Sequence, residues 1–150
     1  MEIDEWDAMG HYNLGSSYYA LQDWKNAERE WKEAIEYEGK QIKSRKKEEI
    51  ISEDELSISL EVRRRPVSFR AHKSLGWMYL HQGQKDKALK EFLKAIELEP
   101  GNAEPYFEAG KIYKEKGERE KAIFYLGKYL YLGGKEEEEA RKLLELLKEK

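Results

Sequence analysis

The residue types that most often carry catalysis or bind metals are scarce in this sequence. There is no cysteine, and the histidines are His11, His72 and His81. Their spacing does not fit a zinc site, and the Gly-Gly-Lys run at 133–135 lacks the rest of a phosphate-binding loop. We therefore expect no catalytic residue, no metal site and no cofactor, and we predict that the protein is not an enzyme.

A basic cluster is the other feature that could do chemistry, because lysine and arginine bind phosphate backbones. It consists of Lys43, Arg45, Lys46, Lys47, Arg63, Arg64 and Arg65. Five carboxylates lie between residues 48 and 55, and no aromatic residue is interleaved for stacking on bases. We expect a solvated, self-paired charge run here, and nucleic-acid binding through this segment is the less favoured alternative.

Two of the histidines belong to a pattern that repeats along the chain. His72, Leu75, Gly76 and Tyr79 are matched by His11, Leu14, Gly15 and Tyr18. A shift of 34 residues superimposes Gly76 on Gly110, Tyr79 on Tyr113, Gly83 on Gly117, Ala88 on Ala122 and Phe92 on Leu126. Such self-similarity at a fixed period indicates a repeat protein with three copies. His11 and His72 share one repeat position, so we expect them to pack at a helix seam.

Each copy is predicted to be a helical hairpin. In the copy at 69–102, apolar residues recur at helical spacing on both sides of Gly83, which can adopt the positive φ that ends a helix. Gly76 and Ala88 leave no bulk, so the two helices can approach closely. Tyr79 and Phe92 then fill the groove between them. A single hairpin cannot bury both of its faces, and neighbouring hairpins must therefore stack.

At these positions the chain resembles the tetratricopeptide repeat (TPR) family, whose pattern is a bulky residue, Leu-Gly, Tyr, a later Ala, an aromatic residue and Pro. The second copy has His72, Leu75, Gly76, Tyr79, Ala88, Phe92 and Pro100. The departures are Gly39 for Pro in the first copy, and Ala109 for Leu, Leu126 for the aromatic residue, Tyr129 for Ala and Gly134 for Pro in the third. The resemblance implies an all-α fold, a right-handed α-solenoid of three repeats. It also implies a protein-interaction scaffold that binds a peptide or helix in a concave groove.

The chain is predicted to form a single domain over residues 1–150. Repeat 1 covers about 8–41, an insert about 42–68, repeat 2 69–102, repeat 3 103–136 and a capping helix 137–149. Asp4 is the predicted N-cap of the first helix, and Ser68 that of the first helix of repeat 2. The segment 40–49 contains no turn signal and can prolong the helix before it.

The insert itself has two competing interpretations. Ser52 to Glu55 has the pattern of a capping box and favours a short helix. Ile58, Leu60 and Val62 alternate with polar residues, which is typical of a strand. These apolar residues could also dock into the groove of another subunit, so a homo-oligomer is the alternative to a monomeric peptide binder.

The resemblance places the groove along a second stripe of each repeat's first helix. The predicted groove residues are Tyr12, Ser16, Tyr19, Arg70, Lys73, Trp77, Leu80, His81, Phe107, Lys111 and Lys114, with Met9 and Glu104 beside them. Four basic residues and one acidic residue make the stripe positive, so we expect a partner with apolar and acidic side chains. The alternative is that the aromatic residues pack against neighbouring helices or the insert.

One TPR subclass binds chaperone C-termini through a Lys/Asn/Asn/Lys/Arg carboxylate clamp. The corresponding residues here are Tyr12, Ser16, Ser74, Glu104 and Glu108. Serine, tyrosine and glutamate cannot supply that set of donors and charges, so we expect no carboxylate-clamp specificity.

Composition agrees with a helical array whose outer faces are charged. Charged residues make up 39% of the chain and aromatic residues 12%, and the net charge is −3. A balance so close to neutral implies no general attraction to nucleic acid or to an anionic membrane. The most apolar stretch, 123–134, is too short to span a bilayer, and the acidic start does not resemble a signal peptide. We expect a soluble, cytoplasmic protein whose Lys and Glu enrichment resembles that of thermophile proteins.

Overall fold

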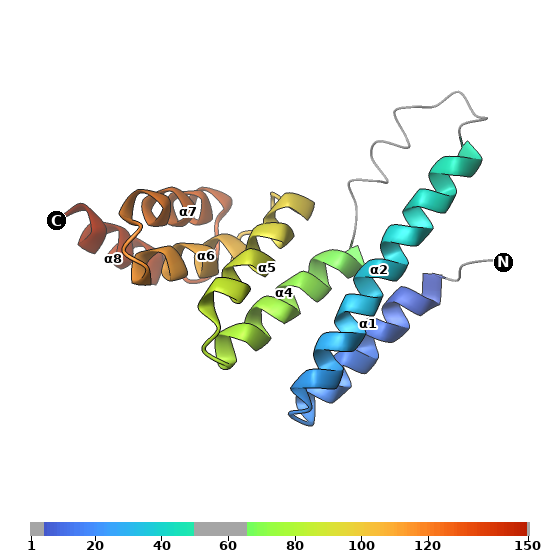
Figure 1. The fold of residues 1–150 in the computed structure, drawn as a ribbon. Coiled ribbons are helices and arrows are strands. Elements are labelled where there is room, and N and C mark those ends of the chain that lie inside the picture. The colour runs from blue at the N-terminus through green and yellow to red at the C-terminus, as the bar shows by residue number, and fades with distance from the viewer. Residues whose placement is uncertain (1–4, 50–65, 150) are drawn as a thin grey trace.

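The structure, a computed structural model, describes residues 5–49 and 66–149, and every regular element in these two ranges is an α-helix (Figure 1). The helices are α1 (Glu5–Ala20), α2 (Trp24–Glu49), α4 (Pro66–His81), α5 (Lys85–Leu98), α6 (Glu104–Glu115), α7 (Arg119–Leu132) and α8 (Glu137–Lys148). Within these ranges, no helix has both the length and the apolar content that crossing a bilayer requires.

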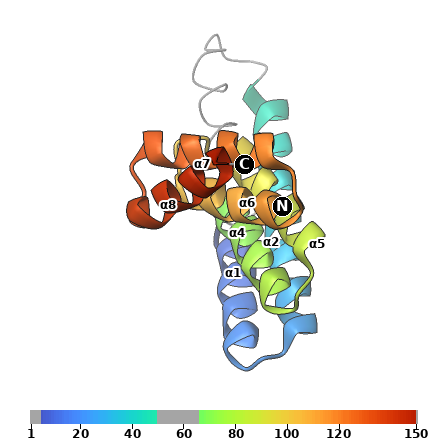
Figure 2. The same ribbon diagram turned by 90° about the vertical axis from the view of Figure 1, so that its left-hand side faces the viewer.

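The helices pack as a one-dimensional series of hairpins. The hairpins are α1 with α2, α4 with α5, and α6 with α7. The second helix of each hairpin also packs on the first helix of the next, and α7 packs on α8 (Figures 1 and 2). This arrangement confirms the predicted all-α fold, an α-solenoid of three hairpins followed by a final helix.

Each hairpin closes where a glycine of its first helix faces a large side chain of its second. The pairs are Gly15 with Trp31, Gly76 with Phe92, and Gly110 with Leu126. A Cβ atom placed on Gly76 would lie 2.8 Å from Cε1 of Phe92, closer than non-bonded carbons approach. The predicted close approach at Gly76 is therefore confirmed.

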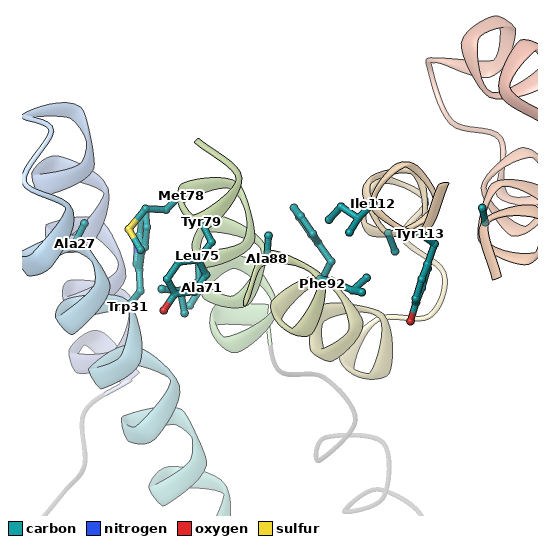
Figure 3. Packing of buried hydrophobic residues seen from close by; sticks show 13 residues of the cluster. Ala27, Trp31, Ala71, Leu75, Met78, Tyr79, Ala88, Phe92, Ile112 and Tyr113 are labelled. Carbon is teal, nitrogen blue, oxygen red and sulfur yellow. The ribbon is translucent and has the colours of Figure 1, made fainter. Parts of the chain in front are cut away.

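The hydrophobic core runs across the seams between hairpins. One cluster joins Trp31 of α2, Leu75 and Met78 of α4, Phe92 of α5 and Ile112 of α6 (Figure 3). Because these side chains come from three hairpins, no hairpin has a core of its own. A second cluster lies under α7 and α8 at the C-terminal end.

The turns inside the hairpins follow the predicted chemistry, with one exception. Gly83 has φ +72° and Gly117 has φ +75°, so both adopt the left-handed conformation that L-residues avoid. The backbone N–H of Gln84 donates to the carbonyl of Tyr79 at 2.8 Å and closes the turn. In the first hairpin the corresponding residue is Gln22, with φ +60°.

The N-terminus of α4 differs from the expectation. The helix begins at Pro66, so Ser68 lies inside it, and the Ser68 hydroxyl is buried without a hydrogen-bond partner among the described residues. The capping group is instead the carboxylate of Glu38, which accepts from the backbone N–H of Val67 at 3.2 Å and of Ser68 at 2.8 Å. Proline suits the first position of a helix because its missing N–H would have no helical partner there.

The predicted limits of the insert, 42 and 68, do not coincide with helix ends. Helix α2 continues to Glu49, as the lack of a turn signal in 40–49 predicted, and α4 starts at Pro66. The predicted cap at Asp4, the capping box at 52–55 and the alternating residues at 58–62 lie outside the described residues. The division into repeats stays a prediction.

Candidate functional site

A cleft opens between the first helices of the first two hairpins. It encloses about 360 Å³ and is lined by Ser16 and Tyr19 of α1, Trp31 of α2, and Ser74, Trp77 and His81 of α4. Four of these six residues were predicted to lie in the groove. The structure therefore gathers Ser16, Tyr19, Trp77 and His81 in one place, although their positions are up to 65 residues apart in the sequence.

Trp31 is the most buried residue of the cleft lining. Its side chain is 2% exposed, and its ring lies against Gly15, where a Cβ atom would be 2.6 Å away. The indole N–H donates to the carbonyl of Tyr12 at 3.2 Å, which fixes the orientation of the ring. The ring of Tyr19 stands beside it, with 5.6 Å between the two centroids.

Tyr19 of α1 and His81 of α4 both line the cleft, with ring centroids 6.3 Å apart. The Tyr19 ring also packs edge-on against the ring of Trp24, with 5.1 Å between the two centroids. Trp77 meets Phe92 edge-on at 5.9 Å. Aromatic rings therefore surround the cleft, and other rings of the protein hold two of them in place.

Trp77 is also tied to the third hairpin. Its indole N–H donates to Oε1 of Glu104 at 3.1 Å, and Lys73 donates to Oε2 of the same carboxylate at 2.6 Å. Glu104 belongs to the first turn of α6, so this carboxylate links α4 to α6. The side chain of Trp77 is consequently positioned before any partner arrives.

The polar atoms at the cleft are mostly engaged within the protein. The Ser16 hydroxyl donates to the carbonyl of Tyr12 at 3.0 Å, and the indole nitrogens of Trp31 and Trp77 have the partners described above. Within the described residues, the Tyr19 hydroxyl and the His81 ring nitrogens have no hydrogen-bond partner, so a ligand would meet mainly aromatic faces with these few free polar groups. The arrangement suits an apolar or aromatic side chain.

Phe107 does not belong to this cleft, which corrects the expectation for this residue. Its side chain is 4% exposed and packs against Tyr129 of α7, with 4.8 Å between the ring centroids. Lys111 lies over the Phe107 ring at 4.4 Å. For this aromatic residue the alternative expectation, packing against a neighbouring helix, is the one observed.

The other predicted groove residues lie outside the cleft lining. Arg70 is exposed, while Tyr12, Leu80 and Lys114 are half-buried. Tyr12 is nevertheless close to the cleft, because its hydroxyl lies 3.5 Å from the hydroxyl of Ser74. Met9 packs with Ala8 and Ala34 near the other end of the first hairpin.

The stripe is less positive than expected, because two of its lysines have acidic partners. Lys73 pairs with Glu104, and Lys111 pairs with Glu108 at 2.9 Å. Glu108 was not counted in the stripe; it is 4% exposed, and burial raises the pKa of its carboxyl group above the usual range. Arg70 and Lys114 are the predicted groove cations for which the described residues offer no ion pair.

Two cleft residues were not among the predicted groove residues. Trp31 packs against Gly15 as Phe92 and Leu126 pack against the equivalent glycines, but tryptophan is wider and also reaches the cleft. Ser74 follows Lys73 directly and its small side chain gives no pattern signal. The signal that could have identified Trp31 is its size, because it is larger than the residues that face the equivalent glycines in the other two hairpins.

The repeated histidines pack at the seam inside their hairpins, as expected. Nδ1 of His11 lies 2.7 Å from Oε2 of Glu30, and Nδ1 of His72 lies 2.6 Å from Oε2 of Glu91. In the described residues, no three His, Asp or Glu side chains gather in a way that could hold a metal ion.

Three segments of the chain match models of one repeat family. Residues 8–40 and residues 103–133 each match a model described as tetratricopeptide repeat, and residues 76–117 match one described as TPR repeat. These segments include parts of all three hairpins. No curated protein sequence matches the chain.

Solved structures of similar fold agree with this assignment. The crystal structure of MamA is 25% identical, with a TM-score of 0.61; the match covers 92% of this chain and 63% of MamA, so this chain spans less than two thirds of that protein. The TPR domain of Arabidopsis OM64 is 16% identical, with a TM-score of 0.65 and coverage of 93% and 94%. The C-terminal TPR-containing domain of a Plasmodium falciparum FK506-binding protein is 16% identical, with a TM-score of 0.66 and coverage of 94% and 85%.

Proposed function

Because the chain belongs to the tetratricopeptide repeat family, whose members form protein-interaction scaffolds and are generally non-catalytic, we propose that it is a non-enzymatic scaffold that binds a peptide or helix of another protein. The cleft between α1 and α4 is the proposed site of recognition. The observation that carries this proposal is the aromatic lining of that cleft, formed by residues of three helices.

The cleft is proposed to take one bulky apolar side chain of the partner. Its volume of about 360 Å³ is near the lower end of the roughly 300–1,000 Å³ typical of ligand pockets. A long segment does not fit into such a space, whereas one aromatic or branched side chain does. Burying an aromatic anchor in a preformed pocket is the arrangement that dominates many interfaces.

Charge outside the cleft is proposed to orient the partner. The exposed guanidinium of Arg70 and the ammonium group of Lys114 lie on α4 and α6, on the stripe that includes Trp77. Acidic residues flanking the apolar anchor would complement these cations. Such rim charges mainly affect the rate of association and the choice of partner.

A display selection with random peptides of about twelve residues on the immobilised protein tests the proposal. We expect the enriched peptides to share one bulky apolar residue with acidic neighbours. Affinities of the best peptides for Tyr19→Ala and Trp77→Ala should fall by about tenfold or more, as measured by calorimetric titration, because each variant removes one side of the cleft.

Tyr131→Ala is the matched control, because Tyr131 is an exposed aromatic residue of α7 and does not line the cleft. Its affinity for the peptides should equal that of the wild type. The proposal fails if all three variants bind the selected peptides equally well, or if no peptide is enriched. Phe107→Ala is not used, because truncation of this buried ring would disturb the fold.

A further inference from the structure

Helix α7 carries an exposed apolar stripe that plays no part in the cleft. Phe124 is 56% exposed and Tyr131 is 84% exposed. Glu120, Gly127 and Lys128 are exposed as well. At 100° per residue, Glu120, Phe124, Gly127 and Tyr131 lie within one narrow sector of the helix, and Lys128 flanks it. We refer to these five residues as the α7 stripe.

The other two hairpins have charged residues at the positions of the two aromatic rings. The position of Phe124 is occupied by Arg29 in α2 and Lys90 in α5, and that of Tyr131 by Glu36 and Glu97. All four charged residues are exposed. The same place on the solenoid is therefore ordinary solvated surface in hairpins one and two, and an aromatic surface in hairpin three alone.

The Phe124 ring of the α7 stripe is supported from within the protein, whereas the Tyr131 ring contacts a lysine of the stripe. Phe124 meets Tyr125 edge-on at 5.2 Å, and Tyr125 in turn stacks on Tyr113 of α6 at 5.2 Å. Nζ of Lys128 lies 5.9 Å from the centroid of the Tyr131 ring. Exposed aromatic rings, one of them held by a neighbouring ring, agree with the aromatic enrichment of interface centres.

We propose that the α7 stripe binds the α7 stripe of a second copy of this chain in an antiparallel helix pair. With the two-fold axis between Phe124 and Gly127, the ring of Phe124 lies over Gly127 of the second copy. A Cβ at Gly127 would have no neighbour within 4 Å, so the ring has an open notch to enter. Both copies contribute the same patch, as a two-fold contact requires.

The charges of the stripe favour a second copy over a different protein. In this register Glu120 of one copy lies opposite Tyr131 of the other, next to Lys128. The described residues give Glu120 no ion pair, and Lys128 contacts only the Tyr131 ring. The stripe therefore carries an unpaired negative end and an unpaired positive end, which match when two copies align in opposite directions.

The contact is expected to be weak. One helix face buries less than the roughly 1,200–2,000 Å² of a stable interface. Self-association is therefore expected to depend on concentration, and it should be followed by sedimentation equilibrium from about 5 µM to about 1 mM. The wild type should pass from monomer to dimer within that range.

The first test fills the notch. Gly127→Gln places a long side chain where Phe124 of the second copy would lie, and we expect the dimer dissociation constant to rise by about tenfold or more. The same substitution should raise the melting temperature of the monomer, because it replaces a glycine inside a helix. A loss of dimer together with a gain of stability cannot come from misfolding.

The second test exchanges charges. Glu120→Lys alone and Lys128→Glu alone should each weaken the dimer, and the double exchange should restore it. Lys90→Ala, at the place on α5 that corresponds to Phe124, should change nothing. A wild type that stays monomeric at about 1 mM, or a dimer that Gly127→Gln and Phe124→Ala leave intact, would overturn the proposal.

Peptide binding separates this inference from the proposed function. Gly127→Gln should bind the selected peptides like the wild type, because the stripe and the cleft share no residue. If the wild type is monomeric and both proteins bind the peptides equally, self-association is overturned while the proposed function stands. If the wild type dimerises and this variant loses the peptides, the cleft is overturned as the peptide site while self-association stands.

Discussion

Gly76 controls how closely α4 and α5 approach. A Cβ atom there would meet two atoms of the Phe92 ring, Cε1 at 2.8 Å and Cζ at 2.9 Å. Phe92 has no exposed surface, and its ring supports Trp77 at the cleft, so it has little freedom to move aside. The absence of a Cβ atom at Gly76 therefore allows the core to pack and also keeps Phe92 in position to support Trp77 at the candidate site.

We expect Gly76→Ala to destabilise the protein by about 1–3 kcal/mol, because overpacking outweighs alanine's greater helix propensity. Gly10→Ala is the matched control: Gly10 also lies in a helix, but a Cβ there has no neighbour within 4 Å. The control should gain roughly 0.5–1 kcal/mol. Urea denaturation measures both, and equal effects would contradict the packing argument.

Two buried glutamates have opposite pKa shifts. Glu30 accepts hydrogen bonds from His11 and from the adjacent Arg29, and these donors hold the pKa of its carboxyl group below the usual range. Glu108 has one ionic partner, Lys111, and burial dominates and raises its pKa. The number of donors around a buried carboxylate decides whether the fold favours its charged or its neutral form.

Glu30→Gln should lower the free energy of unfolding at pH 7, and Glu108→Gln should raise it, because the two pKa shifts have opposite directions. At a pH above the pKa that Glu30 has in the unfolded chain, its ionised carboxylate stabilises the fold fully. This stabilisation is lost as the pH falls through the lower pKa of the folded state. For Glu108, the protein loses stability as the pH rises through the raised pKa of the folded state, because the buried carboxyl group must then ionise. Glutamine does not ionise and avoids that loss. Denaturation at pH 7 and pH 3 should show both differences shrinking in acid; the same sign for both variants would refute this account.

At the scale of elements, α2 is longer than a repeat requires, and its added turns contribute to the next hairpin. Glu38 is 7% exposed, and its carboxylate accepts the N–H groups of Val67 and Ser68 at the start of α4. The first N–H groups of a helix have no helical acceptor. A carboxylate there satisfies two of them and also interacts favourably with the positive end of the helix dipole.

Glu38→Ala is expected to cost about 1–2 kcal/mol, the usual effect of losing a helix cap. Amide hydrogen exchange at Val67 and Ser68 should accelerate more than exchange in the middle of α4. Glu36→Ala is the control, because Glu36 is an exposed residue of the same helix that pairs with Lys40. If both variants have the same effect, the cap does not stabilise α4.

These elements also show what sequence can and cannot predict. The Gly76 and Phe92 contact was predictable because the same types recur at one spacing, and a repeat must satisfy the same geometry in each copy. The cap by Glu38 was not, because it joins residues 29 and 30 positions apart that do not belong to the repeating pattern. Ser68 had the right residue type for a cap, but Pro66 begins the helix before it.

The candidate site was predictable in part for the same reason. Helical periodicity placed Ser16, Tyr19, Trp77 and His81 on one side of their helices, and the structure gathers them in the cleft. Phe107 follows the same periodicity but is buried, because Tyr129 occupies the place of a small residue and packs against it. Whether a residue of the stripe is accessible to a partner depends on the side chains of the neighbouring helices. Periodicity within one helix does not reveal those side chains.

At the scale of the whole molecule, helix α8 covers an apolar face of the third hairpin: Ala140 and Leu144 are buried against the cluster of Phe107, Leu126 and Tyr129. Gly134, between α7 and α8, packs directly against the Tyr129 ring, because a Cβ there would lie only 1.9 Å from that ring. The Tyr129 hydroxyl donates to the carboxylate of Glu136 at 2.6 Å, and burial with this hydrogen bond raises the Tyr129 pKa to about 12.

In a stacked array each hairpin contacts only its neighbours, so damage at one end should stay local. Leu144→Ala removes a side chain that is 9% exposed, and we expect it to destabilise the C-terminal hairpin by about 2–4 kcal/mol. Leu146→Ala is the control on the same helix, since Leu146 is 55% exposed; its effect should stay within about 0.5 kcal/mol. Hydrogen exchange should accelerate in α6, α7 and α8 of Leu144→Ala and remain unchanged in α1 and α2. Equal acceleration along the whole chain would mean that the molecule unfolds as one unit and that α8 is more than a local cover.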